Sequence, residues 1–61
     1  MSKIKLHTPY KILRHAGPVG TYAPAYFDGN GNAIFILNGK PEKFDPQTGA
    51  CISNQTYRIE L

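Results

Sequence analysis

Turn-forming residues recur along this chain about every eight to twelve residues, so each segment between them is short. The turn-forming segments cover residues 17–20, 28–32, 38–39 and 45–49, and they are rich in glycine, proline, asparagine and aspartate. Segments of this length are typical of strands. We therefore predict an all-β fold, either a small antiparallel sheet or an SH3/OB-like barrel, with about five short strands.

The chain is long enough for one domain, residues 1–61, with a small core. Cys51 is the only cysteine, which excludes a disulfide within the chain and is typical of a reducing compartment. The first seven residues lack the apolar run of a signal peptide, and no segment has the apolar length of a membrane span. We expect a cytoplasmic protein, with no membrane partner, that a homo-oligomer or a complex would stabilise further.

Apolar and polar residues alternate over residues 3–7 and 57–61, which predicts a half-buried strand at each end. Residues 33–37 are the most apolar run and predict a central strand. In the segment 21–27, Pro24 lacks an amide proton, so a strand there is an edge or begins after the proline. Further strands are expected over residues 40–44 and 50–53.

Residues 10–14 fit two structures. A strand would place Tyr10 and Ile12 on one face. A short helix over residues 9–16 would begin at a threonine–proline cap and end before a glycine. A helix of about two turns is marginal without tertiary support, so the β-rich context favours the strand.

The segment 28–32 resembles part of a calcium loop, because side-chain oxygens stand at positions 1, 3 and 5. An EF-hand loop also needs glycine at position 6 and glutamate at position 12, where this chain has Ala33 and Gly39. We therefore predict a hairpin turn between the flanking apolar runs. Asn38 and Gly39 predict a second, two-residue type I′ turn.

The chain lacks the residue groupings that catalysis or metal binding requires. His7, His15 and Cys51 are the only soft ligands, without the short paired spacing of a zinc site. Cys51 lies between Ala50 and Ile52, a pattern typical of core packing. The carboxylates show no pairing for acid–base work, and no glycine-rich phosphate loop precedes a helix. We expect no enzymatic activity and no cofactor.

Positive charge is concentrated in the first fifteen residues, which contain four lysine or arginine residues and no acid, within a net charge of +3. Such a segment suits an acidic partner, or a solvated strand face on which lysines prevent unwanted pairing. Farther along, Tyr22, Pro24 and Tyr26 would form an exposed stripe if one strand ran through them with Phe27 inside. Exposed tyrosines suit protein recognition or stacking on unpaired bases, and a tyrosine lying over apolar neighbours is the plain alternative.

Two function classes fit these features. The first is a small non-enzymatic binding protein, an inhibitor or regulator that docks on a larger protein partner, as is common among phage and mobile-element proteins. The second is a nucleic-acid-binding small β-barrel that uses a basic N-terminal strand beside exposed tyrosines. The residues expected to contact the partner are Tyr22, Tyr26, Lys3, Lys5, Lys11 and Arg14.

Overall fold

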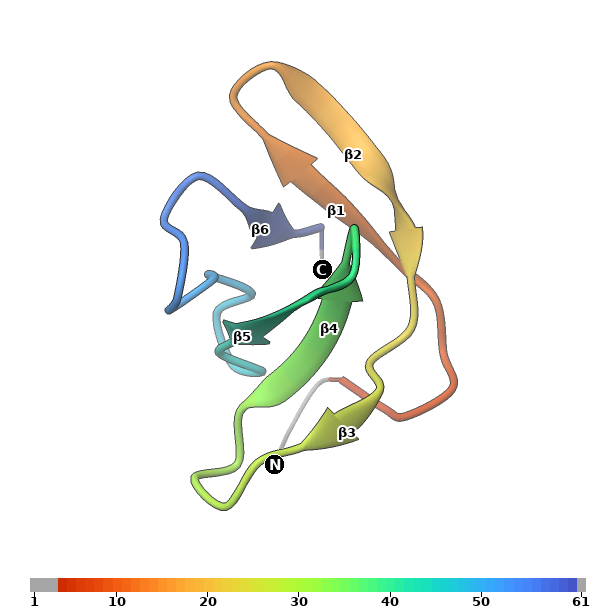
Figure 1. Cartoon of the computed structure of the whole chain (residues 1–61), viewed down its shortest axis with the longest axis vertical. Coiled ribbons are helices and arrows are strands. Elements are labelled where there is room, and N and C mark those ends of the chain that lie inside the picture. The colour runs from red at the N-terminus through yellow and green to blue at the C-terminus, as the bar shows by residue number, and fades with distance from the viewer. Residues whose placement is uncertain (1–3, 61) are drawn as a thin grey trace.

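The structure, a computed structural model, describes residues 4–60, which form six strands and no helix (Figure 1). The strands are β1 (Tyr10–Arg14), β2 (Gly17–Tyr22), β3 (Tyr26–Phe27), β4 (Ala33–Leu37), β5 (Lys40–Phe44) and β6 (Arg58–Ile59). They make two antiparallel sheets of three strands each, ordered β2-β1-β6 and β3-β4-β5. The predicted all-β class is confirmed, and residues 10–14 are a strand rather than a helix.

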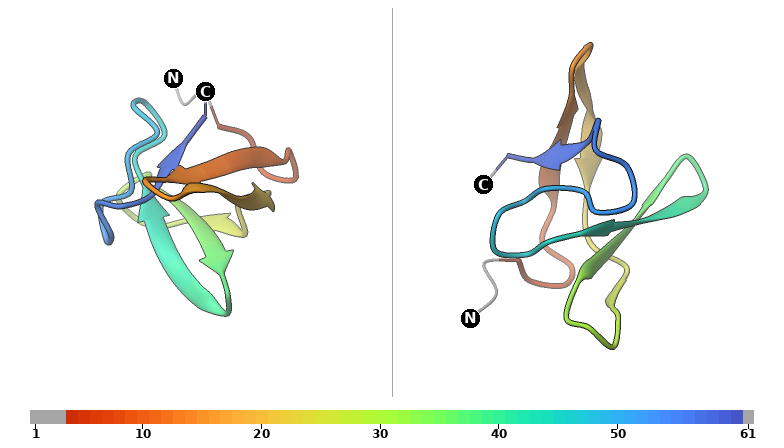
Figure 2. Two further views of the ribbon diagram at one scale, coloured as in Figure 1. Left: turned by 90° about the horizontal axis from the view of Figure 1, so that it is seen from above. Right: turned by 90° about the vertical axis from the view of Figure 1, so that its left-hand side faces the viewer.

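Residues 49–52 join the two sheets. The amide of Ile59 in β6 donates to the carbonyl of Gly49 at 2.7 Å, and the amide of Ile52 donates to the carbonyl of Lys43 in β5, also at 2.7 Å. Figure 2 shows this segment running beside both strands. One short connection therefore fixes the edge of one sheet against the edge of the other.

Both sheets contribute to a single core. Phe35 of β4 and Phe44 of β5 are fully buried, and their rings meet edge to face with centroids 5.0 Å apart and an interplanar angle of 71°. This is a favoured geometry for aromatic pairs. The buried cluster contains Ile4, Ile12, Ala33, Phe35, Leu37, Phe44, Cys51 and Ile59.

Both predicted hairpin turns form, with different backbone geometry. Asn38 and Gly39 connect β4 to β5 with φ angles of 53° and 81°, the left-handed pair that a type I′ turn requires. Residues 28–32 connect β3 to β4 as a longer loop, in which only Gly31 has a positive φ, 81°. The side chain of Asp28 organises this loop instead.

Residues 4–7 do not form the predicted N-terminal strand. Ile4 is buried as the alternation implied, but the chain then turns: the amide of Thr8 donates to the carbonyl of Lys5 at 3.3 Å, and His7 has a φ of 67°. The nearest strand, β1, already pairs with β2 on one side and β6 on the other, so it offers no free edge. Lys3 and Leu61 lie outside the described residues.

The predicted loop at residues 17–20 is also wrong, because these residues begin β2. The register opposite β1 shifts between Ile12 and Leu13, which pair with Gly20 and Pro18, so Val19 is an extra residue in the edge strand. A bulge of this kind lets an edge strand contain both proline and glycine. The predicted strand at 50–53 is reduced to isolated bridges.

Candidate functional site

Strand β4 has at least one buried side chain on each of its two faces. Ala33, Phe35 and Leu37 belong to the core, so by alternation Ile34 and Ile36 point to the opposite face of the sheet. Ile34 is nevertheless only 2% exposed, although it is not a member of the core cluster. The outer face of this sheet therefore has a buried apolar centre of its own.

The neighbours of Ile34 in the ladder share this outer face, because residues paired across strands project to the same side. Tyr26 in β3 and Lys43 in β5 pair with Ile34 from its two sides, and Pro41 pairs with Ile36. The segment beyond β5 adds Ile52, since the preceding Cys51 faces the core. We call this surface the Ile34 face; it consists of Tyr26, Ile34, Ile36, Pro41, Lys43 and Ile52.

Three of the four large hydrophobic residues that are exposed within residues 4–60 belong to the Ile34 face. Tyr26 is 50% exposed, Ile36 41% and Ile52 55%, and the remaining large exposed hydrophobic residue, Leu6 at 39%, is not part of this face. Single exposed hydrophobic residues are normal on protein surfaces. Several of them on one sheet face, around a buried isoleucine, indicate a surface suited to binding.

The charged border of this face is provided by Lys43 and Asp28. The Nζ of Lys43 lies 3.9 Å from Oδ2 of Asp28, and the lysine side chain is 51% exposed. Oδ1 of Asp28 accepts the amides of Asn30 and Asn32 at 2.9 Å each. These hydrogen bonds, that of Asn32 above all, hold the pKa of Asp28 below its ordinary value. The Asp28 carboxylate therefore stabilises the loop at residues 28–32.

Residues 4–60 contain one thiol and several side chains of the kinds that ligate metals. No group of three or more histidine, cysteine, aspartate or glutamate side chains gathers there in a way that could hold a metal ion. Cys51 is a free thiol, 4% exposed and packed in the core.

The predicted tyrosine stripe does not form. Tyr26 is exposed, but Pro24 is buried and Tyr22 is half-buried against the core. The ring of Tyr22 lies over Gly20, with Cε1 only 3.1 Å from the place a Cβ would occupy. The strand stops between Tyr22 and Tyr26, so the alternation that predicted the stripe does not continue through it. The expectation that both tyrosines contact a partner stays a prediction.

The predicted basic residues do not share one strand face. Lys5 lies in the N-terminal turn, where its amide donates to the hydroxyl of Tyr10 at 2.9 Å. Lys11 in β1 approaches Glu60, with 3.8 Å between Nζ and Oε2. Arg14 lies at the other end of β1 and lines a pocket between β1 and β6.

Sequence reasoning missed Ile36 and Ile52 as surface residues. The available signal was the uninterrupted apolar run at 33–37: a strand exposes alternate residues to opposite faces, so one set had to leave the core. The same alternation predicts that Ile52 is exposed, because the preceding Cys51 is in the core. Their grouping with Tyr26, however, depends on the register of three strands, which the sequence does not specify.

No helix in the described part of the chain reaches the length and apolarity needed to cross a lipid bilayer. Comparison with protein-family models, with curated proteins and with solved structures gave no match to this chain.

Proposed function

We propose that this protein is a small non-enzymatic binding module that docks on a larger protein through the Ile34 face. The observation that carries the proposal is the gathering of Tyr26, Ile36 and Ile52 on one sheet face. Protein interfaces combine an apolar centre, enriched in aromatic residues, with a polar border. Tyr26 supplies the aromatic side chain, and Lys43 with Asp28 supplies the border.

The dimensions of the chain support a single partner of this kind. A standard interface buries about 800 Å² on each side, and the chain exposes 4038 Å², so one face with its border is sufficient. The backbone beneath the face is held by the β4–β5 ladder and by Ile34, which lowers the entropy lost on binding.

The proposal extends to an inhibitor or regulator of the kind that phage and mobile elements encode, acting in the cytoplasm. The small size supports this role, because such proteins act by covering a surface of their target. The buried free thiol of Cys51 supports a reducing compartment.

The test is a pull-down from the source cell with three purified proteins: wild type, a Tyr26→Ala/Ile52→Ser variant and Leu6→Ser. Leu6→Ser is the matched control, because it removes an exposed apolar side chain outside the Ile34 face. We expect wild type and Leu6→Ser to retain the same protein and the double variant to lose it. Equal retention by all three proteins, with the double variant folded, would overturn the proposal.

Light scattering on the same proteins separates a larger partner from self-association. A monomeric wild type is expected. A dimer that the double variant abolishes would assign the Ile34 face to a second copy of this chain and would contradict a larger partner.

A second candidate, a nucleic-acid-binding β-module, is supported by one observation: Arg14 and Arg58 line the same pocket as Tyr57. Binding to single-stranded DNA at two salt concentrations tests it. Phosphate contacts predict an affinity that falls steeply with salt, and absence of binding at low salt would exclude this candidate.

A further inference from the structure

Ile34 is buried on a face of its sheet that is otherwise open. Tyr26, Ile36 and Ile52 on the same face are exposed, so no second layer of residues 4–60 lies over it, yet Ile34 is only 2% exposed. Its cover must come from neighbouring side chains. Tyr26 and Lys43, the two residues opposite Ile34 in the ladder, project to the same side of the sheet and can supply it.

The side chain of Lys43 crosses β4 on this face. Lys43 lies in β5 and Asp28 directly follows β3, so β4 lies between the two residues in the sheet. The Nζ of Lys43 is nevertheless 3.9 Å from Oδ2 of Asp28. Since Lys43 projects to the same side as Ile34, its apolar stem reaches over β4 beside that isoleucine. We call Lys43, with its partner Asp28, the lysine strap.

The lysine strap is held weakly. The 3.9 Å between Nζ and Oδ2 is longer than a hydrogen bond, and the Lys43 side chain is 51% exposed, so the ion pair stabilises little. Asp28 has other partners: Oδ1 accepts the amides of Asn30 and Asn32, and Oδ2 accepts the side-chain amide of Asn32 at 3.5 Å. Of the groups that lower the pKa of Asp28, the Asn32 amide has the largest effect and Lys43 the smallest. The ammonium group can therefore leave Asp28 while the loop stays closed.

A partner that docks on this face meets one charge. Lys43 is the only charged member of the Ile34 face, and its side chain is exposed, whereas that of Asp28 is only 16% exposed and accepts hydrogen bonds from its own loop. A complementary surface therefore presents an acidic group to the lysine, and an apolar group to the isoleucines around it.

We infer that the lysine strap determines specificity on the docking surface, and that the partner segment bound there carries a carboxylate beside an apolar side chain. The carboxylate pairs with Lys43, which leaves Asp28, and the apolar side chain replaces the lysine stem on Ile34. One exposed ion pair is exchanged for another, and the apolar contact adds buried area. A lysine or arginine of the partner at this position would be repelled. This inference rests on the proposed docking through the Ile34 face and adds the chemistry of the partner.

The test is an NMR titration of the full-length protein, labelled at its isoleucine methyl groups, with three capped five-residue peptides. Leucine alternates in them with aspartate, with asparagine or with lysine. The aspartate peptide is expected to shift the methyl signals of Ile34 and Ile36. It should bind about fivefold more tightly than the asparagine peptide, because its hydrogen bond to Lys43 is charge-assisted. The lysine peptide should bind most weakly of the three.

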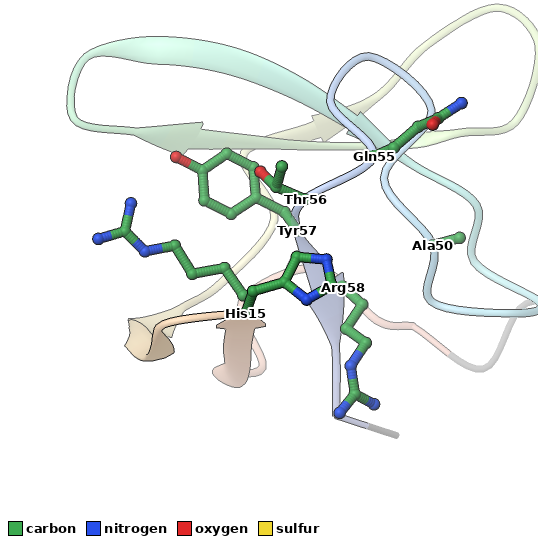
Figure 3. A pocket seen from close by; sticks show the side chains of 7 residues that line it. His15, Ala50, Gln55, Thr56, Tyr57 and Arg58 are labelled. Atoms are coloured by element: carbon green, nitrogen blue, oxygen red, sulfur yellow. The ribbon is translucent and has the colours of Figure 1, made fainter.

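Variants of Lys43 test its role directly. Lys43→Met keeps an apolar stem without the charge and should abolish the preference for aspartate over asparagine. Lys43→Glu should reverse the order, so that the lysine peptide binds best. Arg58→Gln is the matched control, because it removes a positive charge from the lining of the pocket between β1 and β6 (Figure 3), which shares no residue with the Ile34 face. It should change the preference by less than about twofold, since distant exposed charges are screened.

Three results would overturn the inference: no methyl shifts with the aspartate peptide, equal binding of the aspartate and asparagine peptides to wild type, or an aspartate preference that survives in Lys43→Glu. The pull-down with Tyr26→Ala/Ile52→Ser judges the docking proposal separately. A protein that wild type and Lys43→Glu retain equally, and that the double variant loses, would support docking through this face and overturn only the role of the lysine strap.

Discussion

Ile34 and Phe35 are consecutive in β4 and both almost fully buried, yet they point to opposite faces of the sheet. Phe35 is covered by the second sheet and the core. Ile34 lies on the outer face between its cross-strand neighbours, Tyr26 and Lys43. The candidate docking surface therefore has a buried isoleucine at its centre and exposed apolar residues around it.

This arrangement predicts that truncating two isoleucines of the same strand destabilises the protein to different extents. Ile34→Ala should lower the free energy of unfolding by about 2–4 kcal/mol, because it removes buried methyl groups. Ile36→Ala should lower it by less than about 1 kcal/mol, since Ile36 is 41% exposed. Urea denaturation of both variants measures the difference. Equal losses would mean that Ile34 is not covered as the structure places it.

The ring pair in the core predicts coupling between Phe35 and Phe44. Each Phe→Leu variant should be destabilised by about 1–2 kcal/mol, and the double variant by less than the sum of the two. An edge-to-face pair accounts for about 0.5–1.5 kcal/mol of coupling in a double-mutant cycle. Phe27→Leu combined with Phe44→Leu is the comparison cycle. A coupling as large in that cycle would show that the ring geometry is not its source.

The β4–β5 turn predicts that Gly39 cannot be replaced without cost. Its φ of 81° is left-handed, so Gly39→Ala should destabilise the protein by about 1–2 kcal/mol. Gly29 is the control: it also has open space around the Cβ position, but its φ is not in the left-handed region. Gly29→Ala should be neutral or slightly stabilising. Thermal unfolding of both variants checks this, and a similar loss in each would contradict the turn assignment.

Asp28 predicts a specific dependence of stability on pH. Its folded-state pKa is held below the ordinary value of 3.8, first by the amide of Asn32, so ionisation of this carboxylate favours the folded state. The stabilisation is complete above the ordinary pKa and is lost as the pH falls through the lower folded-state pKa. Wild type should therefore be more stable than Asp28→Asn at neutral pH, and the difference should shrink below about pH 3.8.

Denaturation of both proteins across this pH range is the measurement. Lys43→Gln is the control, because it removes only an exposed ion-pair partner at 3.9 Å. It should keep most of the pH dependence of wild type. A gap between wild type and Asp28→Asn that stays constant down to pH 2 would contradict the role given to this carboxylate.

The parts of the fold that the sequence predicted are those that local chemistry decides. Asn38 and Gly39 determine a tight turn by their own backbone preferences, and residues 33–37 become the central strand of their sheet because nothing polar interrupts them. The prediction that a strand in this segment is an edge or begins after Pro24 is confirmed, because β3 begins at Tyr26.

The parts that the sequence did not predict depend on partners distant in the chain. Residues 3–7 alternate like a strand, but the edges of β1 are occupied by β2 and β6. The candidate site also depends on residues that are distant in the chain. Tyr26 was identified from the sequence, whereas its neighbours Ile36 and Ile52 required the register of the sheet and the path of residues 49–52.

The pairing of Ile12 with Ile59 bears on the order in which the molecule assembles. Closing a long loop costs more entropy and takes more time than closing a tight turn. Sheet β3-β4-β5 needs only neighbouring segments, whereas sheet β2-β1-β6 must bring strands from opposite ends of the described chain together. We expect pulsed hydrogen exchange to find the amides of β4 protected before that of Ile59. The apolar docking surface would then exist early in folding, before the last strand has closed.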